Sequence, residues 1–399
     1  MTGRSLLALG GGASRTGVPR LLASLLHELT STGELDPSRV RVLLRTGGPL
    51  EDDLGRTASV RVLGPTASLA GPLAARVHPR ARPLGDWVGL NAGLVTRPAR
   101  SDPGPPDLVW ANGADAARMA AVLPRAARRA PLVVHVHELA IGLRRSLAGS
   151  SPHHLLDRAD VVVAVSDAVR AHLEDDVGLS PDRVAVHRGW VPGLGPAPIE
   201  RVDPRRPAPV PAGALLVGSC GSIGWRKGTD LFLDLARHLP ESIDGRPIHL
   251  VWVGGPARAG DDGRAAREVA LRGLDHRVHL VGEMPDAAPW LAGLDLLVHP
   301  AREDAFPLAV LEAGARAVPV VGFRSGGIVE ALPEADHAAC LADLFDGDGL
   351  ADRVRALLVD ATARSAIGTR LAHRISENHA ERPAVAALWR DVGERLGWS

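Results

Sequence analysis

The chain has 399 residues, 45% of them hydrophobic and 23% charged, which is enough for two hydrophobic cores and excludes a single small domain. Its 46 basic and 46 acidic side chains cancel, so the broad positive field that nucleic-acid binding requires is absent. Two cysteines exclude a disulfide framework. With no signal-peptide pattern and no apolar stretch long enough to cross a membrane, the sequence predicts a soluble, cytoplasmic protein.

The first half alternates short apolar runs with helix-patterned segments, as parallel sheets joined by crossover helices do. Helices are expected over 18–29 and 113–129. This alternation predicts a doubly wound, Rossmann-like α/β domain over 1–192. We expect its strands at 5–10, 40–44, 59–64, 107–112, 131–138, 160–166 and 183–189.

A proline- and glycine-rich segment, 193–213, has neither the apolar spacing of a helix nor that of a strand, and it is predicted to be a linker. The alternation then resumes and predicts a second doubly wound domain over 214–380, with helices near 230–239 and 307–317. Two such domains facing each other would leave a central cleft beyond the carboxyl ends of their strands. Its strands are expected at 214–220, 248–255, 276–282, 294–300 and 317–323.

The last segment, 381–399, has the apolar spacing of an amphipathic helix. Its apolar face would carry Val385, Leu388, Val392 and Leu396. Two placements are open: the helix packs back on the first domain, or it ends the second.

Lys227 is the only lysine, and it lies in GSCGSIGWRKG, where a predicted strand ends in glycines and a helix opens near Thr229. Small residues let backbone amides approach an anion, a helix N-terminus adds partial positive charge, and Arg226 and Lys227 add full charges. The segment therefore predicts a diphosphate cradle, although it lacks the spacing of a P-loop. An ordinary glycine turn with a solvated basic pair is the alternative.

Asp304 and Glu312 flank the start of the helix expected near Pro307. Asp304 would lie on the entry loop and Glu312 about one and a half turns inside the helix. Carboxylates accept hydrogen bonds from sugar hydroxyls without a metal. Helix capping is the alternative for Asp304, but it does not account for Glu312 in an otherwise apolar run.

These motifs together resemble the retaining glycosyltransferases of family 4, which have the two-domain GT-B fold. The resemblance covers about four fifths of the chain and extends to the glycine-rich loop 10–17 and the strand end at 135–138. The specific elements in the second half are Arg226-Lys227-Gly228, the acid pair Asp304 and Glu312, and Ser325-Gly326-Gly327 followed by Glu330.

The resemblance implies a nucleoside-diphosphate sugar, such as a UDP- or GDP-sugar, as donor. Lys227 would neutralise its diphosphate, Glu312 would bind the ribose, and Asp304 would bind the transferred sugar beside Phe306, Pro307 and Leu308. From the first domain, His137 would face the sugar and Gly12 would pack under the phosphates. Backbone groups near Gly282 and Glu283 would lie close to the base.

Two departures from the family pattern concern charge and reach. The family usually has glutamate at the position of Asp304, and often arginine where this chain has Ser222, so Arg226 would supply the missing charge. His135 precedes His137 by two residues, but a His-x-His zinc site would lack a third ligand, so no metal is expected.

The expected reaction is front-face sugar transfer with retention, without metal. A nucleotide-sugar epimerase and a non-catalytic nucleotide-sugar binder are the alternatives. A phosphorylase is excluded because its cofactor needs a lysine and the single one is already assigned.

The acceptor is expected to be a small molecule, such as a specialised metabolite or an envelope precursor. Between Arg56 and Arg145 there are 13 arginines against 5 acids, a local excess that also leaves a membrane surface open as a partner. The base, the sugar, the linkage and the oligomeric state do not follow from the sequence.

Overall fold

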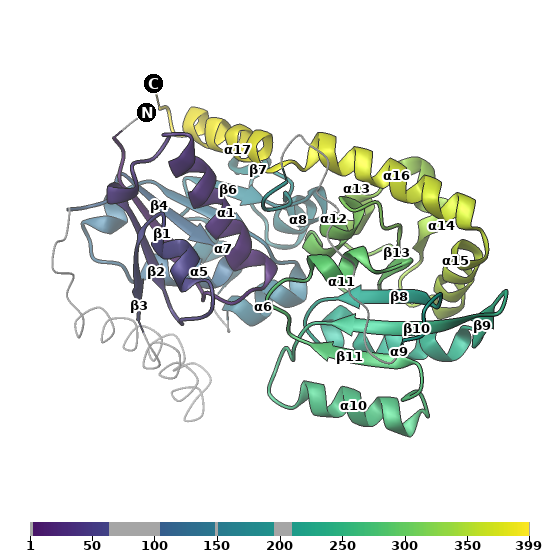
Figure 1. Cartoon of the computed structure of the whole chain (residues 1–399). Coiled ribbons are helices and arrows are strands. Elements are labelled where there is room, and N and C mark those ends of the chain that lie inside the picture. Colours follow the sequence, from purple (N-terminus) through teal and green to yellow (C-terminus); the bar gives the residue numbers. More distant parts are fainter. Residues whose placement is uncertain (1–2, 64–103, 148–150, 195–209, 399) are drawn as a thin grey trace. The chain divides into compact units, whose positions relative to one another are not determined.

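The computed structural model describes residues 3–63, 104–147, 151–194 and 210–398. These residues form two compact units, one made of Met1–Gly193 with Glu381–Ser399 and the other of Leu194–Ala380 (Figure 1). Most of the predicted linker (195–209) and much of the arginine-rich stretch (64–103) lie outside the described residues.

The first unit is built on a parallel sheet whose strands are almost entirely buried. β6 is the run Val-Val-Val-Ala with all four residues buried, as expected for a strand covered on both faces. Among the described residues seven strands pair in the order 3-2-1-4-5-6-7, which reverses between β1 and β4. They are β3 (Ser59–Val62), β2 (Val40–Leu44), β1 (Leu6–Gly10), β4 (Leu108–Asn112), β5 (Leu132–Val136), β6 (Val161–Ala164) and β7 (Val184–Val186).

Helices connect these strands, and the leucine spacing of α1 shows why they form. α1 buries Leu21, Leu22, Leu25, Leu26 and Leu29, which share one face. The predicted helix over 113–129 is wrong in length: α5 ends at Ala121, because Pro124 lacks an amide hydrogen and disfavours a helical residue before it. Among the described residues, the helices between these strands are α1 (Gly17–Ser31), α2 (Glu51–Gly55), α5 (Ala114–Ala121), α6 (Ala140–Leu147), α7 (Pro152–Leu156) and α8 (Asp167–Ala171).

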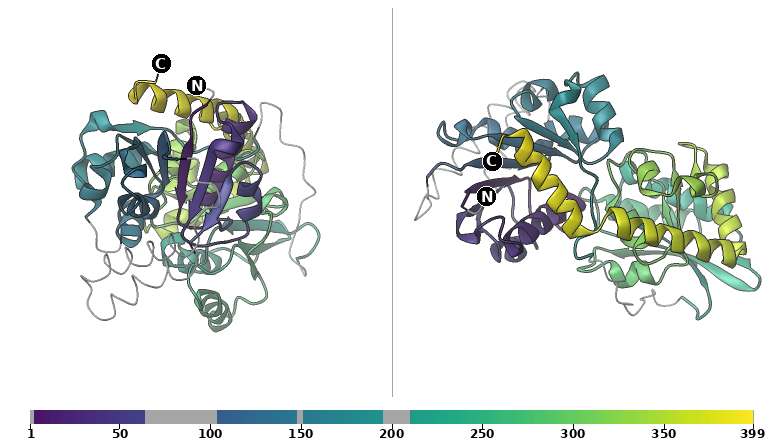
Figure 2. Two further views of the ribbon diagram at one scale, coloured as in Figure 1. Left: turned by 90° about the vertical axis from the view of Figure 1, so that its left-hand side faces the viewer. Right: turned by 90° about the horizontal axis from the view of Figure 1, so that it is seen from above.

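The last helix, α17 (Glu381–Arg395), packs against α1 in the first unit (Figures 1 and 2). Val385, Leu388, Trp389 and Val392 join the core that α1 and the sheet form. Polar contacts fix its start and its middle: Glu381 accepts hydrogen bonds from Ser24 Oγ and the amide of Gly193, and Asp391 Oδ2 lies 2.8 Å from His187 Nε2. The first unit therefore uses both ends of the chain.

The second unit repeats the same topology. Its parallel strands pair in the order 11-10-8-12-13-14, which reverses between β8 and β12, and β9 pairs antiparallel with β10. The strands are β8 (Leu215–Cys220), β9 (Ser242–Ile243), β10 (Arg246–Val253), β11 (Val278–Gly282), β12 (Leu296–His299), β13 (Val320–Phe323) and β14 (Leu341–Ala342).

One helix of the second unit is shorter than predicted, and the backbone gives the reason. The helix predicted over 307–317 ends at Gly314, and three residues later Ala317 has a φ of +57°, which no helix can continue through. The helices are α9 (Thr229–His238), α10 (Asp261–Leu271), α11 (Ala288–Ala292), α12 (Leu308–Gly314), α13 (Ile328–Ala331), α14 (His337–Cys340), α15 (Gly347–Val359) and α16 (Ala361–Asn378).

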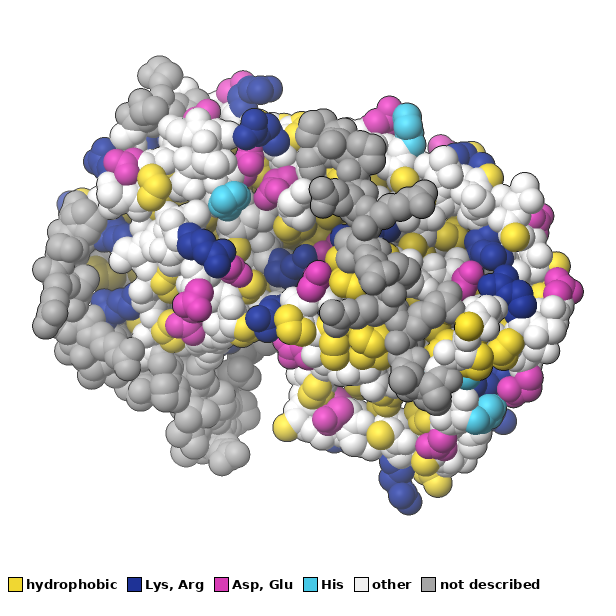
Figure 3. Space-filling view, in the orientation of Figure 1, with side chains coloured by type: hydrophobic (Ala, Val, Ile, Leu, Met, Phe, Trp, Pro, Cys, Tyr) yellow, Lys and Arg dark blue, Asp and Glu magenta, His cyan; other side chains and the backbone are white. Residues whose placement is uncertain are grey.

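Surface charge and helix length add two observations. On the face drawn in Figure 3, basic and acidic side chains are interspersed rather than gathered by sign. Within the described ranges, no helix combines the length and the apolar character that crossing a membrane requires.

Candidate active site

The second unit brings the predicted donor residues to the carboxyl edge of its sheet. β8 and β12 are neighbours at the point where the strand order reverses, and ligands of doubly wound sheets bind at such points. The loop after β8 passes so close to the end of β12 that a side chain on Gly228 would lie 2.0 Å from the carbonyl oxygen of Pro300. Gly228 also has a φ of +74°, so glycine is required here on two grounds.

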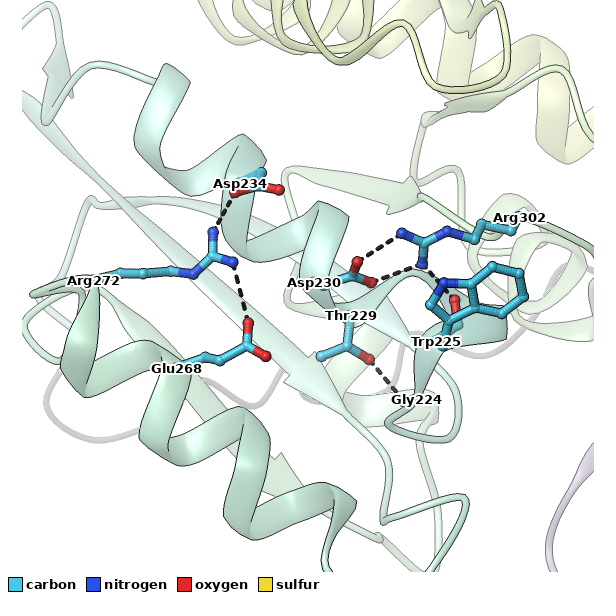
Figure 4. A network of polar contacts seen from close by, with 8 residues as sticks. All are labelled: Gly224, Trp225, Thr229, Asp230, Asp234, Glu268, Arg272 and Arg302. Atoms are coloured by element: carbon cyan, nitrogen blue, oxygen red, sulfur yellow. Dashed lines mark hydrogen bonds and ion pairs between the residues drawn. The ribbon is translucent and has the colours of Figure 1, made fainter.

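Arg302 ties these two loops together. Its amide donates to the carbonyl of Arg226 at 2.9 Å, and its guanidinium donates to the carbonyl of Trp225 at 2.6 Å. The same guanidinium pairs with both carboxylate oxygens of Asp230, at 2.8 and 2.6 Å, and stacks over the Trp225 ring (Figure 4). Arg302 therefore connects the loop after β12 with the turn Trp225–Lys227 and with Asp230 in α9.

Arg226 is partly committed to the same scaffold. Its guanidinium donates to the carbonyl oxygen of Glu303 at 2.8 Å. Arg226, which was predicted to add positive charge for binding the diphosphate, therefore also links the two loops.

Lys227, which is partly buried, and Asp304, which is buried, form an ion pair between the same loops. His299, at the end of β12, places Nε2 3.3 Å from the same carboxylate oxygen of Asp304. Burial alone would raise the pKa of Asp304, but the adjacent charge of Lys227, with His299 and Arg226, holds it well below its usual range. Burial lowers the pKa of His299, and Asp304 opposes that shift. Asp304 is therefore an ionised carboxylate whose charge Lys227 balances.

The loops after β10 and β11 adjoin the cradle. The amide of Gly221, next to Ser222, donates to Val253 at 2.9 Å, and the indole of Trp252 donates to the carbonyl of Gly221 at 2.8 Å. The amide of Gly254 donates to Gly282 at 2.9 Å. Glu283 lies over Gly255, where an added side chain would come within 3.1 Å of its Cβ. Gly282 and Glu283 thus lie beside the loop after β10, and the end of β10 contacts Gly221, the residue before Ser222.

α12 places the remaining predicted residues. Pro307 precedes the helix, Leu308 begins it, and Glu312 is buried in its second turn. The Phe306 ring packs on His379 at 5.4 Å between centroids. The turn 325–327 supports the loop before the helix, because the amide of Gly327 donates to the carbonyl of Asp304 at 3.1 Å.

The first unit has a polar pocket at its own switch point. It encloses about 280 Å³ and is bordered by the glycine-rich loop after β1, the loop 46–47 and residues that follow β4 and β5. Gly12 lines it so closely that an added side chain would come within 2.6 Å of Thr46 Oγ1. The lining residues are Gly11, Gly12, Ser14, Thr16, Val18, Pro19, Thr46, Gly47, Asn112, Gly113, Asp115 and Glu138.

His137 follows β5 and contacts this pocket through Asn112. Its Nε2 lies 3.0 Å from Asn112 Oδ1, and its ring lies 4.1 Å from that of His135. Burial lowers the pKa of His137 to about 3. Burial also raises the pKa of Glu138 to about 7, although its carboxylate accepts from the amides of His137 and Ala114.

The structure distributes the predicted residues over both units: Gly12 and His137 lie in the first, and all the others lie in the second. Sequence reasoning missed Asn112, Glu138, His299 and Arg302. Each lies within two residues of the end of a predicted strand, and that position is the signal that could have found them. In the part of the chain that the structure describes, no three His, Cys, Asp or Glu side chains gather as metal ligands would.

Two family models match the chain. The one described as "Glycosyl transferase 4-like domain" matches residues 16–190, and the one described as "Glycosyl transferases group 1" matches residues 214–360. Each model therefore falls mainly on one of the two units.

Curated relatives agree with these matches. The lipopolysaccharide core biosynthesis mannosyltransferase LpsB of Rhizobium meliloti is 29% identical over 243 residues, covering 60% of this chain and 67% of its own length. The D-inositol 3-phosphate glycosyltransferase of Corynebacterium urealyticum is 28% identical over 255 residues, or 61% of this chain and 56% of its own length. The chain thus matches between about half and two thirds of the length of these relatives.

The crystal structure of Anabaena HepE in complex with UDP and glucose has a TM-score of 0.72 and 20% sequence identity. The alignment covers 98% of this chain and 99% of that one. This likeness shows the fold: two Rossmann-like domains of the GT-B type, as predicted.

Proposed function

The chain belongs to the group 1 glycosyltransferases, and we propose that it transfers a sugar from a nucleoside diphosphate to a small-molecule acceptor, with retention at the anomeric carbon and without a metal ion. The observation that carries this proposal is the ion pair of Lys227 and Asp304 at the carboxyl ends of β8 and β12.

The pair is suited to binding a diphosphate and a sugar together. A diphosphate carries more negative charge than one carboxylate, so it competes with Asp304 for the ammonium of Lys227. Asp304, with its pKa held low, then accepts hydrogen bonds from a sugar hydroxyl instead. The same exchange gives a reason for lysine at this position in a chain whose other 45 basic residues are arginine. The compact ammonium of lysine can move from one anion to another, whereas the planar guanidinium of arginine would bind both at once.

The other predicted residues have supporting roles in this proposal. Glu312 accepts hydrogen bonds from the ribose hydroxyls, and the backbone at Gly282 and Glu283 lies beside the base. Ser222 and Arg226 face the diphosphate, and the segment 306–308 lies along the sugar. In the first unit, Gly12 and His137 are the residues for which the family resemblance implies contacts with the phosphates and the sugar.

The reaction breaks the bond between the anomeric carbon and the diphosphate oxygen and forms a bond from that carbon to the acceptor oxygen on the same face. The acceptor proton passes to the departing phosphate oxygen, and the nucleoside diphosphate leaves. Lys227, assisted by Arg226, stabilises the charge that develops on the leaving group, which is the main electrostatic contribution of the protein.

Replacing Lys227 by alanine tests the proposal. We expect the Lys227→Ala variant to lose transfer by about 100-fold or more while the far-ultraviolet circular dichroism spectrum is unchanged. Arg264→Ala is the matched control, because the Arg264 side chain is 79% exposed on α10. Release of nucleoside diphosphate from a panel of UDP- and GDP-hexoses, with and without acceptor, is the measurement.

The same assay separates the alternatives. Acceptor-dependent release supports the transferase. Loss of donor without any acceptor would favour an epimerase, and tight donor binding without turnover would favour a nucleotide-sugar binder. Full transfer by Lys227→Ala would contradict the assignment.

The names of the relatives guide the choice of acceptors. They describe a mannosyltransferase of lipopolysaccharide core and glycosyltransferases of D-inositol 3-phosphate. We therefore propose that the acceptor is a polyhydroxylated ring, either a sugar of an envelope precursor or a cyclitol, and both belong in the panel.

A further inference from the structure

We propose that Asn112 fixes His137 as the tautomer with hydrogen on Nε2, so that Nδ1 stays a hydrogen-bond acceptor for a hydroxyl of the transferred sugar. Asn112 would then be a positioning residue. The part that concerns the sugar rests on the proposed function; the assignment of the tautomer does not.

The orientation of the Asn112 amide follows from its other partner. Asn112 ends β4 beside the switch point and is 3% exposed. Its Nδ2 donates to the backbone carbonyl of Val18 at 2.9 Å. A carbonyl oxygen can only accept a hydrogen bond, so the nitrogen of the amide has to face Val18 and the oxygen has to face the other way.

The tautomer of His137 follows from that orientation. Asn112 Oδ1 lies 3.0 Å from His137 Nε2, and an oxygen that only accepts requires a hydrogen on the nitrogen it meets. Burial keeps the ring neutral, with its pKa lowered to about 3, so that hydrogen is the only one on the two ring nitrogens. Nδ1 therefore carries a lone pair.

The backbone and ring plane of His137 are held as well. Glu138 Oε2 accepts from the amide of His137 at 2.9 Å, and the same carboxylate accepts from the amide of Ala114 at 3.2 Å. The His135 ring packs on the His137 ring with an interplanar angle of 44°. With the ring position fixed, the role of each nitrogen depends on Asn112.

A neutral acceptor has a defined chemical preference. Nδ1 accepts from a hydroxyl, which can donate, and repels a carboxylate, which cannot. We infer that His137 selects a donor sugar with a hydroxyl at the contacted position over one with a carboxylate there.

Nitrogen NMR of the full chain labelled with ¹⁵N-histidine tests the tautomer directly. His137 is assigned by comparison with a His137→Gln variant. At mildly alkaline pH we expect the wild-type spectrum to show hydrogen on Nε2 and none on Nδ1. Hydrogen on Nδ1 in the wild type would overturn the proposal even if no variant folds.

Two substitutions of Asn112 separate a positioning role from a structural one. Asn112→Ala removes both hydrogen bonds, whereas Asn112→Asp loses the bond to Val18 but keeps an acceptor for Nε2. We expect a mixture of tautomers and a loss of kcat of about tenfold in Asn112→Ala. In Asn112→Asp, at mildly alkaline pH, we expect the wild-type tautomer and recovery of most of the kcat. Equal losses in both variants would mean that the bond to Val18 is what counts, and would overturn the proposal.

Titration with donor tests the contact with sugar. Adding a nucleoside-diphosphate hexose should shift the Nδ1 signal of His137, and adding the nucleoside diphosphate alone should not. A bound hexose donor that leaves Nδ1 unshifted would overturn the proposal. If no such donor binds, the proposed function fails instead, and the spectrum without donor still decides the tautomer.

Discussion

In the first unit, the strands that part at the switch point carry a glycine loop and an asparagine, with a neutral histidine beside them; in the second, they carry a lysine, an arginine and an aspartate. Both sheets have the same strand order up to their sixth strand. Topology therefore provides the place for a site, and the loops decide its chemistry. The second unit places two basic side chains and an ionised carboxylate at its switch point, whereas the first places glycines and an amide there beside two carboxylic acids, Asp115 and Glu138.

The two units also differ in how their cores are completed, because α17 packs into the core of the first unit only. The largest predicted effect tests this difference. Leu388 on α17 is fully buried in the first-unit core, so Leu388→Ala should lower the free energy of unfolding of that unit by about 2–5 kcal/mol. Hydrogen exchange should quicken in β1 and β4 and stay unchanged in β8 and β10. Leu271→Ala, at a side chain 71% exposed in the second unit, is the control and should change little. Equal acceleration in both units would contradict the assignment of α17 to the first core.

A smaller effect on the free energy of unfolding concerns Glu138 in the first unit. Burial raises the pKa of Glu138 from 4.5 to about 7, so the stability that this group contributes is full below pH 4.5 and is lost as the pH rises through 7. Glu138→Gln removes this dependence. Relative to the wild type, the variant should gain about 1–3 kcal/mol between pH 5 and pH 8.

Urea unfolding at both pH values measures this difference. Asp52→Asn, at an exposed acid on α2, is the control. A gap between variant and wild type that does not change with pH would show that Glu138 is ionised throughout.

The smallest effect sharpens the role of Arg302 in the second unit. Arg302 and Arg272 each pair with an acid on α9, but only Arg302 also bonds the cradle loop (Figure 4). Arg302→Ala should therefore raise the donor KM about tenfold, since it loosens the turn that carries Lys227, whereas Arg272→Ala should leave it unchanged. Steady-state kinetics with varied donor measures both. Equal KM changes in the two variants would mean that the ion pairs on α9 act through stability alone.

The sequence predicted the family and the fold, and both are confirmed. Periodicity was informative because buried strands such as β6 are rich in β-branched residues, and α1 repeats leucine on one face. It failed where a single residue decides, as at Pro124 and at the left-handed Ala317. The roles of the site residues stay predictions.

Which site residues contact one another could not be predicted from the sequence. Lys227 and Asp304 were each recognised, but their ion pair joins positions 77 apart and depends on β8 lying next to β12. Asn112 was missed because its contact with His137 crosses from β4 to β5, and neither residue carries a local signal for the other. Strand neighbours are a property of the folded sheet, so contacts between loops of adjacent strands emerge only with the structure.

The return of α17 to the first unit has a consequence for biosynthesis. During synthesis, Leu194–Ala380 leaves the ribosome before α17, which supplies Val385 and Leu388 to the first core. The second unit can therefore fold completely before the core of the first unit is complete. The earlier-made half is the later to mature, and a nascent chain truncated near residue 380 would carry one finished module and one with an open apolar flank.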